Sequence, residues 1–282
     1  MNPIQIEHLS KKYPGFELTG VSFSLQPGKI TGLIGRNGAG KSTTLKCILN
    51  FVHPDAGTVR FFGLPFAEHE AEIKEKIGYV AGAFDYYSKK KLKVITNVVR
   101  RFYKSWDSEA YRACLTRFAL DEEKTPEQLS AGMKVKYALT LALSHNAELL
   151  ILDEPTSGLD PVSRDELLEL FLQLRDEGKT ILFSTHITSD LEKCAGHILY
   201  IRKGKLAADL PLDTFVGGYR VVTFAEDALT DGQKRNLVGL RRDRQAYSAV
   251  IAAEDADRLG IPAKEADLET VMLHLEREEE QL

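Results

Sequence analysis

Short apolar stretches bounded by turn residues recur through the first part of the chain. Ile4 begins a stretch in which apolar and polar side chains alternate, and Pro27-Gly28 marks the turn into an apolar run that ends at Ile34. Such stretches between glycine, proline and polar residues are typical of strands. The pattern predicts strands at residues 4–9, 21–25, 30–34, 58–62 and 77–80.

A helical pattern replaces the strand pattern between about residue 83 and residue 145. Apolar side chains recur there at helical spacing, and glycines are few. We expect helices at residues 94–103, 108–118 and 133–145, which together form a helical subdomain of about residues 83–145.

A fully apolar run follows at residues 149–152 and ends in Asp153-Glu154. A continuous apolar run of this length is expected for a parallel strand that is buried on both faces. The two acids then lie at the carboxyl end of the strand, which is where open α/β sheets bind their ligands.

The next two elements complete a β-α-β unit. Asp160 is predicted to cap a helix that begins at Pro161, carries apolar residues on one face and stops at Gly178. A strand at residues 180–184 follows and leads into His186. Because such connections are right-handed and parallel strands end at the same edge, we expect His186 to lie near Glu154 in an α/β fold.

The pattern of apolar residues and glycines changes in the C-terminal part of the chain. After a short strand at 205–208 and a helical turn at 212–216, Gly217-Gly218 is a plausible hinge. We therefore predict a main domain at residues 1–216 and a small α+β appendix at residues 217–282. The appendix has strand-like stretches at 219–224 and 246–252, and Leu268, Val271, Met272 and Leu275 lie at the spacing of an amphipathic helix.

Composition narrows the class of protein. A chain of 282 residues can form one large and one small domain, and its formal net charge of −4 argues against a nucleic-acid partner. The three cysteines are widely spaced and in no metal-ligand pattern, which suits free thiols in a reducing cytoplasm. We find no targeting signal and no apolar run that approaches 18 residues, so we expect a protein that does not itself span a membrane.

Gly35 to Thr43 carries the strongest chemical signal in the chain, because it matches the G-x-x-x-x-G-K-S/T pattern of a phosphate-binding loop. Backbone amides and the following helix N-terminus attract phosphates, Lys41 reaches the β- and γ-phosphates, and Ser42 can ligate Mg²⁺. An ordinary glycine-rich turn is the alternative, but a strand before the loop and a helix after it favour nucleotide binding. The candidate nucleotide-binding residues here are Gly35, Asn37, Gly38, Ala39, Gly40, Lys41, Ser42 and Thr43.

The acids after residue 152 indicate what is done with the nucleotide. Asp153 is placed to hold Mg²⁺ together with Ser42, and Glu154 is placed to polarise the water that attacks the γ-phosphate. His186 can hydrogen-bond the γ-phosphate or that water. The alternative is that both acids only cap the loop at the end of the strand.

With these motifs in place, residues 4–215 resemble the ATP-binding subunits of ABC transporters, with a P-loop NTPase core, an antiparallel β subdomain and a helical subdomain. Residues 35–43 match the family's Walker A loop, and residues 149–154 match its Walker B strand with the catalytic glutamate. Leu129-Ser130-Ala131-Gly132-Met133 resembles the signature sequence, and residues 157–160 match the loop between protomers. His186 matches the switch histidine, and Tyr13 matches the aromatic residue that stacks on adenine, although a loop tyrosine is often plain packing.

The resemblance implies two chains arranged head to tail around two ATP molecules. Ser130, Gly132 and Asp160 are then expected to contact the nucleotide of the other subunit, which is either a second copy or a related ATPase subunit. From the residues alone, Ser130 is equally a helix N-cap. The resemblance also implies ATP and Mg²⁺ as cofactors. The family's partner is a separate membrane permease, which implies a location at the cytoplasmic face of the membrane.

Two stretches depart from the family's pattern. Ala131 and Met133 replace the usual Gly and Gln of the signature, and Ala81-Gly82 stands where the family usually has Pro-Gln. Because Gly82 has no side-chain amide, we hypothesise that residues 85–87 take over part of the coupling to the permease. The lysines at 89, 90, 91 and 93 form either a solvated face or a docking surface for a permease or for anionic lipid.

Residues 267–272 resemble the C-terminal helix of ATPases from the ABC-2 type exporter group, and this points to export of drugs, antibiotics or peptides, as in phenol-soluble modulin transporters. The appendix either supports dimerisation or adds stabilising packing. Two other functions stay open: an ABC-type ATPase of DNA repair or translation, and a regulatory module that nucleotide only switches.

Overall fold

A computed structural model describes residues 2–81, 87–225, 229–242 and 246–277 of the chain. The described residues divide into two compact units, Met1–Asp209 and Leu210–Leu282. The sequence placed the boundary after residue 216. The structure includes helix α8 (Leu212–Gly217) in the second unit, where the Phe215 ring lies 5.7 Å from that of Tyr219 in an edge-on contact.

The first unit is built on a six-stranded sheet with the strand order β10-β9-β3-β8-β7-β6. The five strands from β9 to β6 in this order are parallel to one another. Every residue of β3 and β8 is buried. In β7 the four apolar residues are buried, as their continuous run predicted. The strands are β3 (Ile30–Ile34), β6 (Ile77–Ala81), β7 (Leu149–Asp153), β8 (Thr180–Thr185), β9 (His197–Arg202) and β10 (Lys205–Pro211).

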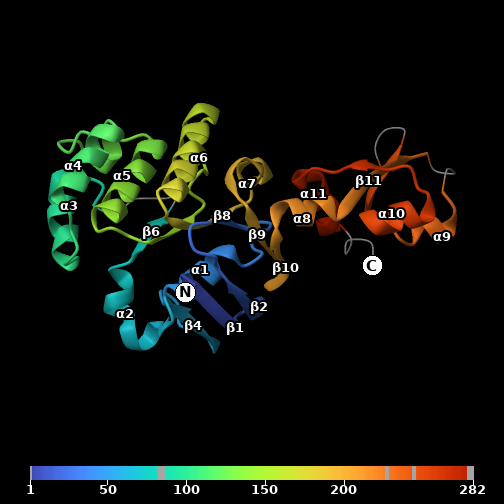
Figure 1. The fold of residues 1–282 in the computed structure, drawn as a ribbon, viewed down its shortest axis with the longest axis horizontal. Coiled ribbons are helices and arrows are strands. Elements are labelled where there is room, and N and C mark those ends of the chain that lie inside the picture. The colour runs from blue at the N-terminus through green and yellow to red at the C-terminus, as the bar shows by residue number, and fades with distance from the viewer. Residues whose placement is uncertain (1, 82–86, 226–228, 243–245, 278–282) are drawn as a thin grey trace. The chain divides into compact units, whose positions relative to one another are not determined.

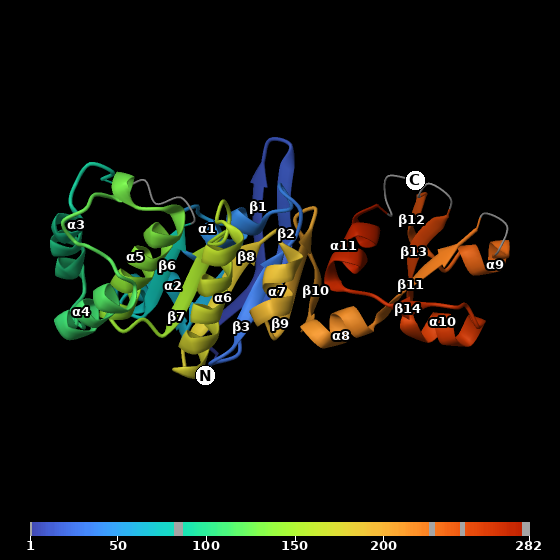
Figure 2. The same ribbon diagram turned by 90° about the horizontal axis from the view of Figure 1, so that it is seen from above.

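Both faces of this sheet are covered (Figures 1 and 2). Helices α6 (Pro161–Asp176) and α7 (Thr188–Cys194) lie on one face. Helix α1 (Lys41–Ile48) and an antiparallel sheet in the order β2-β1-β4-β5 lie on the other. One apolar cluster joins the antiparallel sheet, α1 and the near face of the central sheet. The antiparallel strands are β1 (Ile4–Tyr13), β2 (Phe16–Ser24), β4 (Ala56–Phe61) and β5 (Leu64–Pro65). This arrangement confirms the predicted α/β P-loop NTPase fold.

Helix α6 forms where its caps and periodicity predict it. The Asp160 carboxylate accepts hydrogen bonds from the Val162 and Ser163 amides at 3.0 Å, and Pro161 occupies the first turn. These contacts lower the pKa of Asp160, with the hydroxyl of Ser163 as the largest cause. The helix ends at Asp176, and Gly178 follows with a left-handed φ of 90°.

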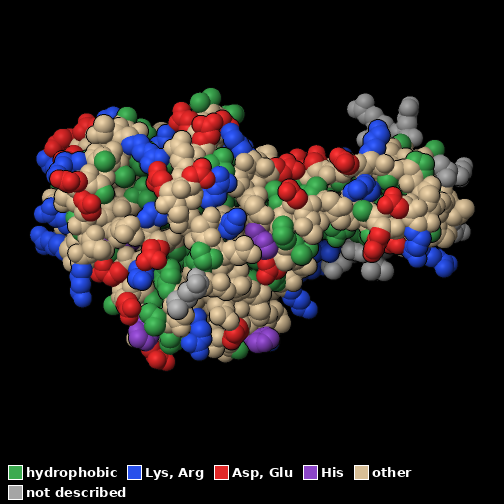
Figure 3. Space-filling view, in the orientation of Figure 1, with side chains coloured by type: hydrophobic (Ala, Val, Ile, Leu, Met, Phe, Trp, Pro, Cys, Tyr) green, Lys and Arg blue, Asp and Glu red, His purple; other side chains and the backbone are tan. Residues whose placement is uncertain are grey.

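A group of helices packs beside strand β6 at one end of the first unit (Figure 2). In its interior the Thr96 hydroxyl contacts the hydroxyls of Tyr111 and Tyr137 at 3.0 and 2.9 Å, and burial raises the pKa of Tyr111 to about 12. Lys and Arg side chains, with acidic ones among them, gather along the outer edge of this group (Figure 3). The helices are α3 (Leu92–Val99), the 3₁₀ turn η1 (Arg100–Phe102), α4 (Ser108–Arg117), the 3₁₀ turn η2 (Pro126–Gln128) and α5 (Ala131–Ser144).

Helix α2 (Phe66–Lys74) was not predicted. Its buried residues are only Phe66 and Ile73, so the sequence lacks the recurring apolar positions that would mark a helix, and His69 interrupts the helix with φ and ψ angles of −122° and 26°.

The second unit is an antiparallel sheet in the order β12-β13-β11-β14 with short helices. Its apolar cluster centres on Val222, Ala249 and Ile251, which are almost completely buried. The strands are β11 (Tyr219–Phe224), β12 (Val238–Arg242), β13 (Tyr247–Ala252) and β14 (Lys264–Glu265), and the remaining helices are α9 (Asp231–Lys234), α10 (Ala253–Leu259) and α11 (Leu268–Arg277).

The three cysteines are free and buried, and burial raises the pKa of the Cys194 thiol to about 12. Among the described helices, none combines the length and the apolar character needed to cross a bilayer.

Candidate functional site

Strand register brings the predicted site residues to one edge of the central sheet. Ile34 at the end of β3 pairs with Thr185 of β8, and Asp153 at the end of β7 pairs with Ser184 of β8. The loop after β3, the acids of β7 and the histidine after β8 therefore leave neighbouring strand ends, as ligand sites of open α/β sheets do.

The loop between β3 and α1 needs its glycines. A Cβ atom on Gly35 would lie 2.2 Å from the Ile201 carbonyl oxygen of β9, so no side chain fits there. Gly38 and Gly40 have left-handed φ angles of 83° and 116°. No side chain caps the first turn of α1, so the loop presents the amides of a helix N-terminus to an anion.

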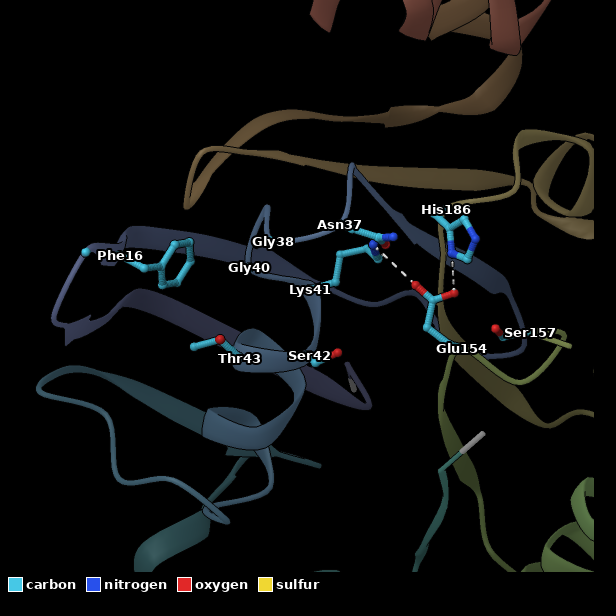
Figure 4. Close-up of a pocket in the computed structure, with 11 residues that line it drawn as sticks. Phe16, Asn37, Gly38, Gly40, Lys41, Ser42, Thr43, Glu154, Ser157 and His186 are labelled. Carbon is cyan, nitrogen blue, oxygen red and sulfur yellow. Dashed lines mark hydrogen bonds and ion pairs between the residues drawn. The ribbon is translucent and has the colours of Figure 1, made fainter. Parts of the chain in front are cut away.

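This loop forms one wall of a cleft of about 630 Å³ (Figure 4). Glu154 and His186 stand opposite Lys41 in the close-up. Gly35 and Ala39 are buried and do not line the cleft. The lining residues are Gly15, Phe16, Asn37, Gly38, Gly40, Lys41, Ser42, Thr43, Glu154, Ser157 and His186.

The Glu154 carboxylate contacts both Lys41 and His186 in the cleft. Its Oε1 lies 3.3 Å from Lys41 Nζ, and its Oε2 lies 2.8 Å from His186 Nδ1. Lys41 is 5% exposed, and its Nζ also donates to the Gly35 carbonyl oxygen at 2.8 Å. A buried lysine held by its own loop presents a fixed positive charge to the cleft, as the lysine that holds the β- and γ-phosphates in P-loop NTPases does.

Asp153 receives two hydroxyl donors on one oxygen. Ser42 Oγ lies 3.1 Å and Ser184 Oγ 2.6 Å from Asp153 Oδ1. Carboxylate and hydroxyl oxygens are hard donors, which Mg²⁺ prefers in combination with water and substrate phosphates. The residues present therefore fit Mg²⁺, with Ser42 and Asp153 as the side chains that would hold it.

The aromatic residue that lines the cleft is Phe16. Tyr13, the sequence candidate for adenine stacking, pairs with Phe16 across the β1–β2 hairpin and is 37% exposed. Its ring lies 5.7 Å from Lys11 Nζ. Phe16 approaches Gly40 closely, because a Cβ on that glycine would lie 3.0 Å from the Phe16 ring. The stacking role of Tyr13 stays a prediction.

Ser130, Gly132 and Asp160 do not line this cleft. Ser130 caps α5, accepting from the Met133 amide at 3.2 Å, and Asp160 caps α6. Gly132 lies against Ser163 at the start of α6. The three residues therefore gather around the N-termini of two helices, away from the nucleotide loop of their own chain.

Three residues near the site were missed by the sequence reasoning. Ser184 contacts Asp153, and Thr156 donates to Asp190 Oδ2 at 2.6 Å. Asp190 is 1% exposed, and burial raises its pKa. Ser184 lies two residues before the recognised His186, and Thr156 lies between the recognised stretches 149–154 and 157–160, but none of the three residues carries a spacing signal that would mark its contact.

The stretch where the chain departs from the family's glutamine lies partly outside the described residues, including Gly82, Asp85 and Tyr86. Of the following lysines, Lys91 and Lys93 contact the Glu123 carboxylate at 2.9 and 2.5 Å. Lys93, followed by Lys91, lowers the pKa of Glu123.

Comparison with known proteins bears on the family of the chain. A family model described as ABC transporter matches residues 18–157. The ABC transporter ATP-binding protein YtrB of Bacillus subtilis is 29% identical, covering 90% of this chain and 88% of that protein. The Nod factor export ATP-binding protein I of Burkholderia orbicola is 35% identical, covering 73% and 70%.

A solved structure described as the ATP-binding subunit of an ABC transporter has a TM-score of 0.67 and 28% identity, covering 74% of this chain and 90% of that one. The chain therefore belongs to the family of ABC transporter ATP-binding proteins, and its enzyme class is that of an ABC transporter ATPase.

Proposed function

We propose that this chain hydrolyses ATP in the cleft between the β3–α1 loop and the end of β7, and that hydrolysis powers export through a separately encoded membrane permease. One observation carries the proposal. The Glu154 carboxylate contacts Lys41 on one oxygen and His186 on the other, at 3.3 and 2.8 Å. Lys41, the proposed phosphate-binding cation, and Glu154, the proposed base, therefore lie side by side in the cleft.

The chain's own residues account for the chemistry. Lys41 and the first amides of α1 hold the phosphates and offset their charge. Glu154 accepts a proton from the attacking water while the water oxygen bonds to the γ-phosphorus. The bond between the γ-phosphorus and the oxygen that bridges it to the β-phosphate breaks. The products are ADP and inorganic phosphate. His186 orients the carboxylate by donating from Nδ1 to Glu154 Oε2.

Ser42 and Asp153 are the side chains proposed to hold Mg²⁺. When bound, the metal would offset negative charge on the phosphate oxygens. Asp153 Oδ1 is already oriented by hydroxyls on two sides, so little side-chain reorganisation is needed to present it.

We also propose a head-to-tail dimer, either of two copies or with a related ATPase subunit. Ser130, Gly132 and Asp160 lie outside the cleft of their own chain. Ser130 stands at the N-terminus of α5, an end of a helix that favours an anion. These positions suit contact with nucleotide bound by the partner.

Export is supported by the name of one relative, which is a Nod factor export protein. The proposed place of work is the cytoplasmic face of the membrane, through the permease. The cargo stays a prediction, with peptides of the phenol-soluble modulin kind as the candidate from sequence. The two other functions, DNA repair or translation and nucleotide-gated regulation, gain no support from the family.

A groove on the first unit supports a permease partner. It lies between α2 and η1 and has a volume of about 900 Å³. Apolar and aromatic side chains line it together with charges of both signs: Val99, Phe102, Tyr103, Glu72, Glu75, Lys74, Lys76 and Lys104. Phe102 is 77% exposed. Exposed apolar side chains rimmed by charges are typical of protein-binding sites. An amphipathic helix from a cytoplasmic loop of the permease, with its apolar face against Phe102, fits this chemistry.

The catalytic proposal is tested by Glu154→Gln. The amide keeps the shape of the side chain but cannot accept the proton, so we expect hydrolysis to fall by about 10² to 10⁴-fold while ATP binding is retained. Steady-state phosphate release and equilibrium ATP titration measure the two quantities. Glu70→Gln, which changes a surface acid paired with Lys74, is the matched control and should leave both unchanged. Hydrolysis close to that of the unaltered protein would remove Glu154 from this role.

The partner proposal is tested by affinity purification of the tagged full chain from a detergent-treated membrane extract. We expect a multi-span permease to co-purify. Phe102→Asp places a charge in the groove and should reduce the recovered permease by about tenfold or more. ATP hydrolysis by the isolated variant should match that of the unaltered protein. Equal recovery with both proteins would rule out the groove as the docking site.

A further inference from the structure

One buried hydroxyl contacts both consecutive acids of the site. Ser184, near the end of β8, is completely buried. Its Oγ donates to Asp153 Oδ1 at 2.6 Å and accepts from the Glu154 amide at 2.9 Å. The register explains the contact, because Ser184 is the residue of β8 directly beside Asp153 of β7.

Glu154 needs such support because its backbone is strained. Its φ angle is 50°, in the left-handed region that non-glycine residues rarely adopt. The Glu154 amide is held by two oxygens of Ser184, the hydroxyl at 2.9 Å and the carbonyl at 3.2 Å. Ser184 therefore holds the backbone conformation from which the Glu154 side chain reaches Lys41 and His186.

The same hydroxyl orients Asp153. The other donor to Asp153 Oδ1 is Ser42, at the longer distance of 3.1 Å. Ser42 is itself a proposed ligand of Mg²⁺, so its hydroxyl has a second use. The hydroxyl of Ser184 gives its one proton to Asp153, and one of its two lone pairs accepts from the Glu154 amide.

We propose that Ser184 is a positioning residue for hydrolysis, which orients Asp153 toward Mg²⁺ and fixes the backbone of Glu154 through a single hydroxyl. The proposal rests on the proposed ATPase mechanism. Ser184 does not line the cleft and acts only through its two neighbours. The competing explanation is that the hydroxyl only satisfies buried polar groups and stabilises the fold.

Ser184→Ala in the full chain separates these explanations. Ser144→Ala is the matched control, because Ser144 is also completely buried and donates to the Thr140 carbonyl oxygen at 2.6 Å, away from the cleft. For both variants and the unaltered protein, we would measure kcat, the KM for ATP, and thermal unfolding. ADP affinity would be titrated once with Mg²⁺ and once with EDTA.

For Ser184→Ala we expect kcat to fall by about 10 to 100-fold, as is typical when a partner of a metal ligand is removed. The KM for ATP should change by less than about threefold, and ADP affinity in EDTA should be unchanged. The advantage that Mg²⁺ confers on ADP binding should shrink by about tenfold. Ser144→Ala should change only thermal unfolding.

A kcat for Ser184→Ala within about twofold of the unaltered protein, or an unchanged Mg²⁺ advantage, would overturn the proposal. So would an equal loss of kcat in Ser144→Ala. If the unaltered protein does not hydrolyse ATP, the proposed function fails instead, while the Mg²⁺ dependence of ADP binding still tests the orientation of Asp153.

Discussion

The two units of the chain bury their apolar side chains in different ways. In the first unit every residue of β8 is buried, because helices cover one face of the sheet and α1 with a second sheet covers the other. In the second unit β11 has only Val222 and Phe224 buried. The chemical motifs all lie in the first unit, since their site needs the neighbouring carboxyl ends of parallel strands, which the antiparallel sheet of the second unit does not provide.

The largest expected effect tests whether the second unit is energetically separate. Ile251→Ala removes a completely buried side chain from its small core and should destabilise that unit by about 2–5 kcal/mol. ADP affinity, which depends on the first unit, should stay within about twofold. Calorimetric unfolding should show one transition shifted and the other unchanged, and Ile251→Val should shift it less, by about 0.5–1.5 kcal/mol. A joint shift of all unfolding would show that the units unfold together.

The next effect is on the nucleotide loop of the first unit. Lys41→Ala removes the buried amine beside Glu154 and should weaken ATP binding by about 100-fold, because a charge-assisted contact with phosphate is lost. Isothermal titration measures the change. Lys46→Ala alters an exposed lysine of the same helix and serves as the control. If Lys41→Ala binds ATP as the unaltered protein does, the cleft is not the nucleotide site.

The smallest effect concerns pH and the helical part of the first unit. The His145 ring stacks on Tyr103 at 3.8 Å, and its Nδ1 lies 3.0 Å from the Glu75 carbonyl oxygen. Burial lowers the pKa of His145 below its ordinary 6.5. As pH falls through 6.5, the unfolded chain therefore binds a proton that the folded chain resists, and stability decreases.

His145→Gln cannot take up that proton, while its amide can still donate to the Glu75 carbonyl. The melting temperature of the unaltered protein should fall more steeply between about pH 7.5 and about pH 5.5 than that of the variant. Parallel curves for the two proteins would contradict the prediction. Because Glu75 and Lys179 also face this histidine, both proteins must be measured at equal ionic strength.

Much of the nucleotide-binding fold follows from local sequence signals. The strands β3 and β7 were predicted to within one residue, because continuous apolar runs that end in glycine or acids are distinctive. Helix α6 was predicted from its Asp160 cap and its apolar face. These signals are local, so they need no knowledge of which strands are neighbours.

Other elements gave weaker signals. Strand β9 was not predicted, although its apolar residues lie between Gly196 and Gly204, because a short apolar run alone does not separate a strand from a buried helix. Its carbonyl at Ile201 is nevertheless what excludes a side chain at Gly35. The boundary between the units also differed from the prediction, because the contacts of α8 rather than the Gly217-Gly218 pair determine it.

The sequence by itself determined the chemistry proposed for the nucleotide site, since residues 35–43 and 149–154 predict phosphate and metal binding from residue type and spacing. Only the tertiary structure decided which side chains support that chemistry. Phe16 lines the cleft because the hairpin turns it there, and Ser184 contacts both acids because β8 lies beside β7 in one register. Such contacts join residues far apart in the chain, and a shift of one residue between the strands would direct the Ser184 side chain to the opposite face.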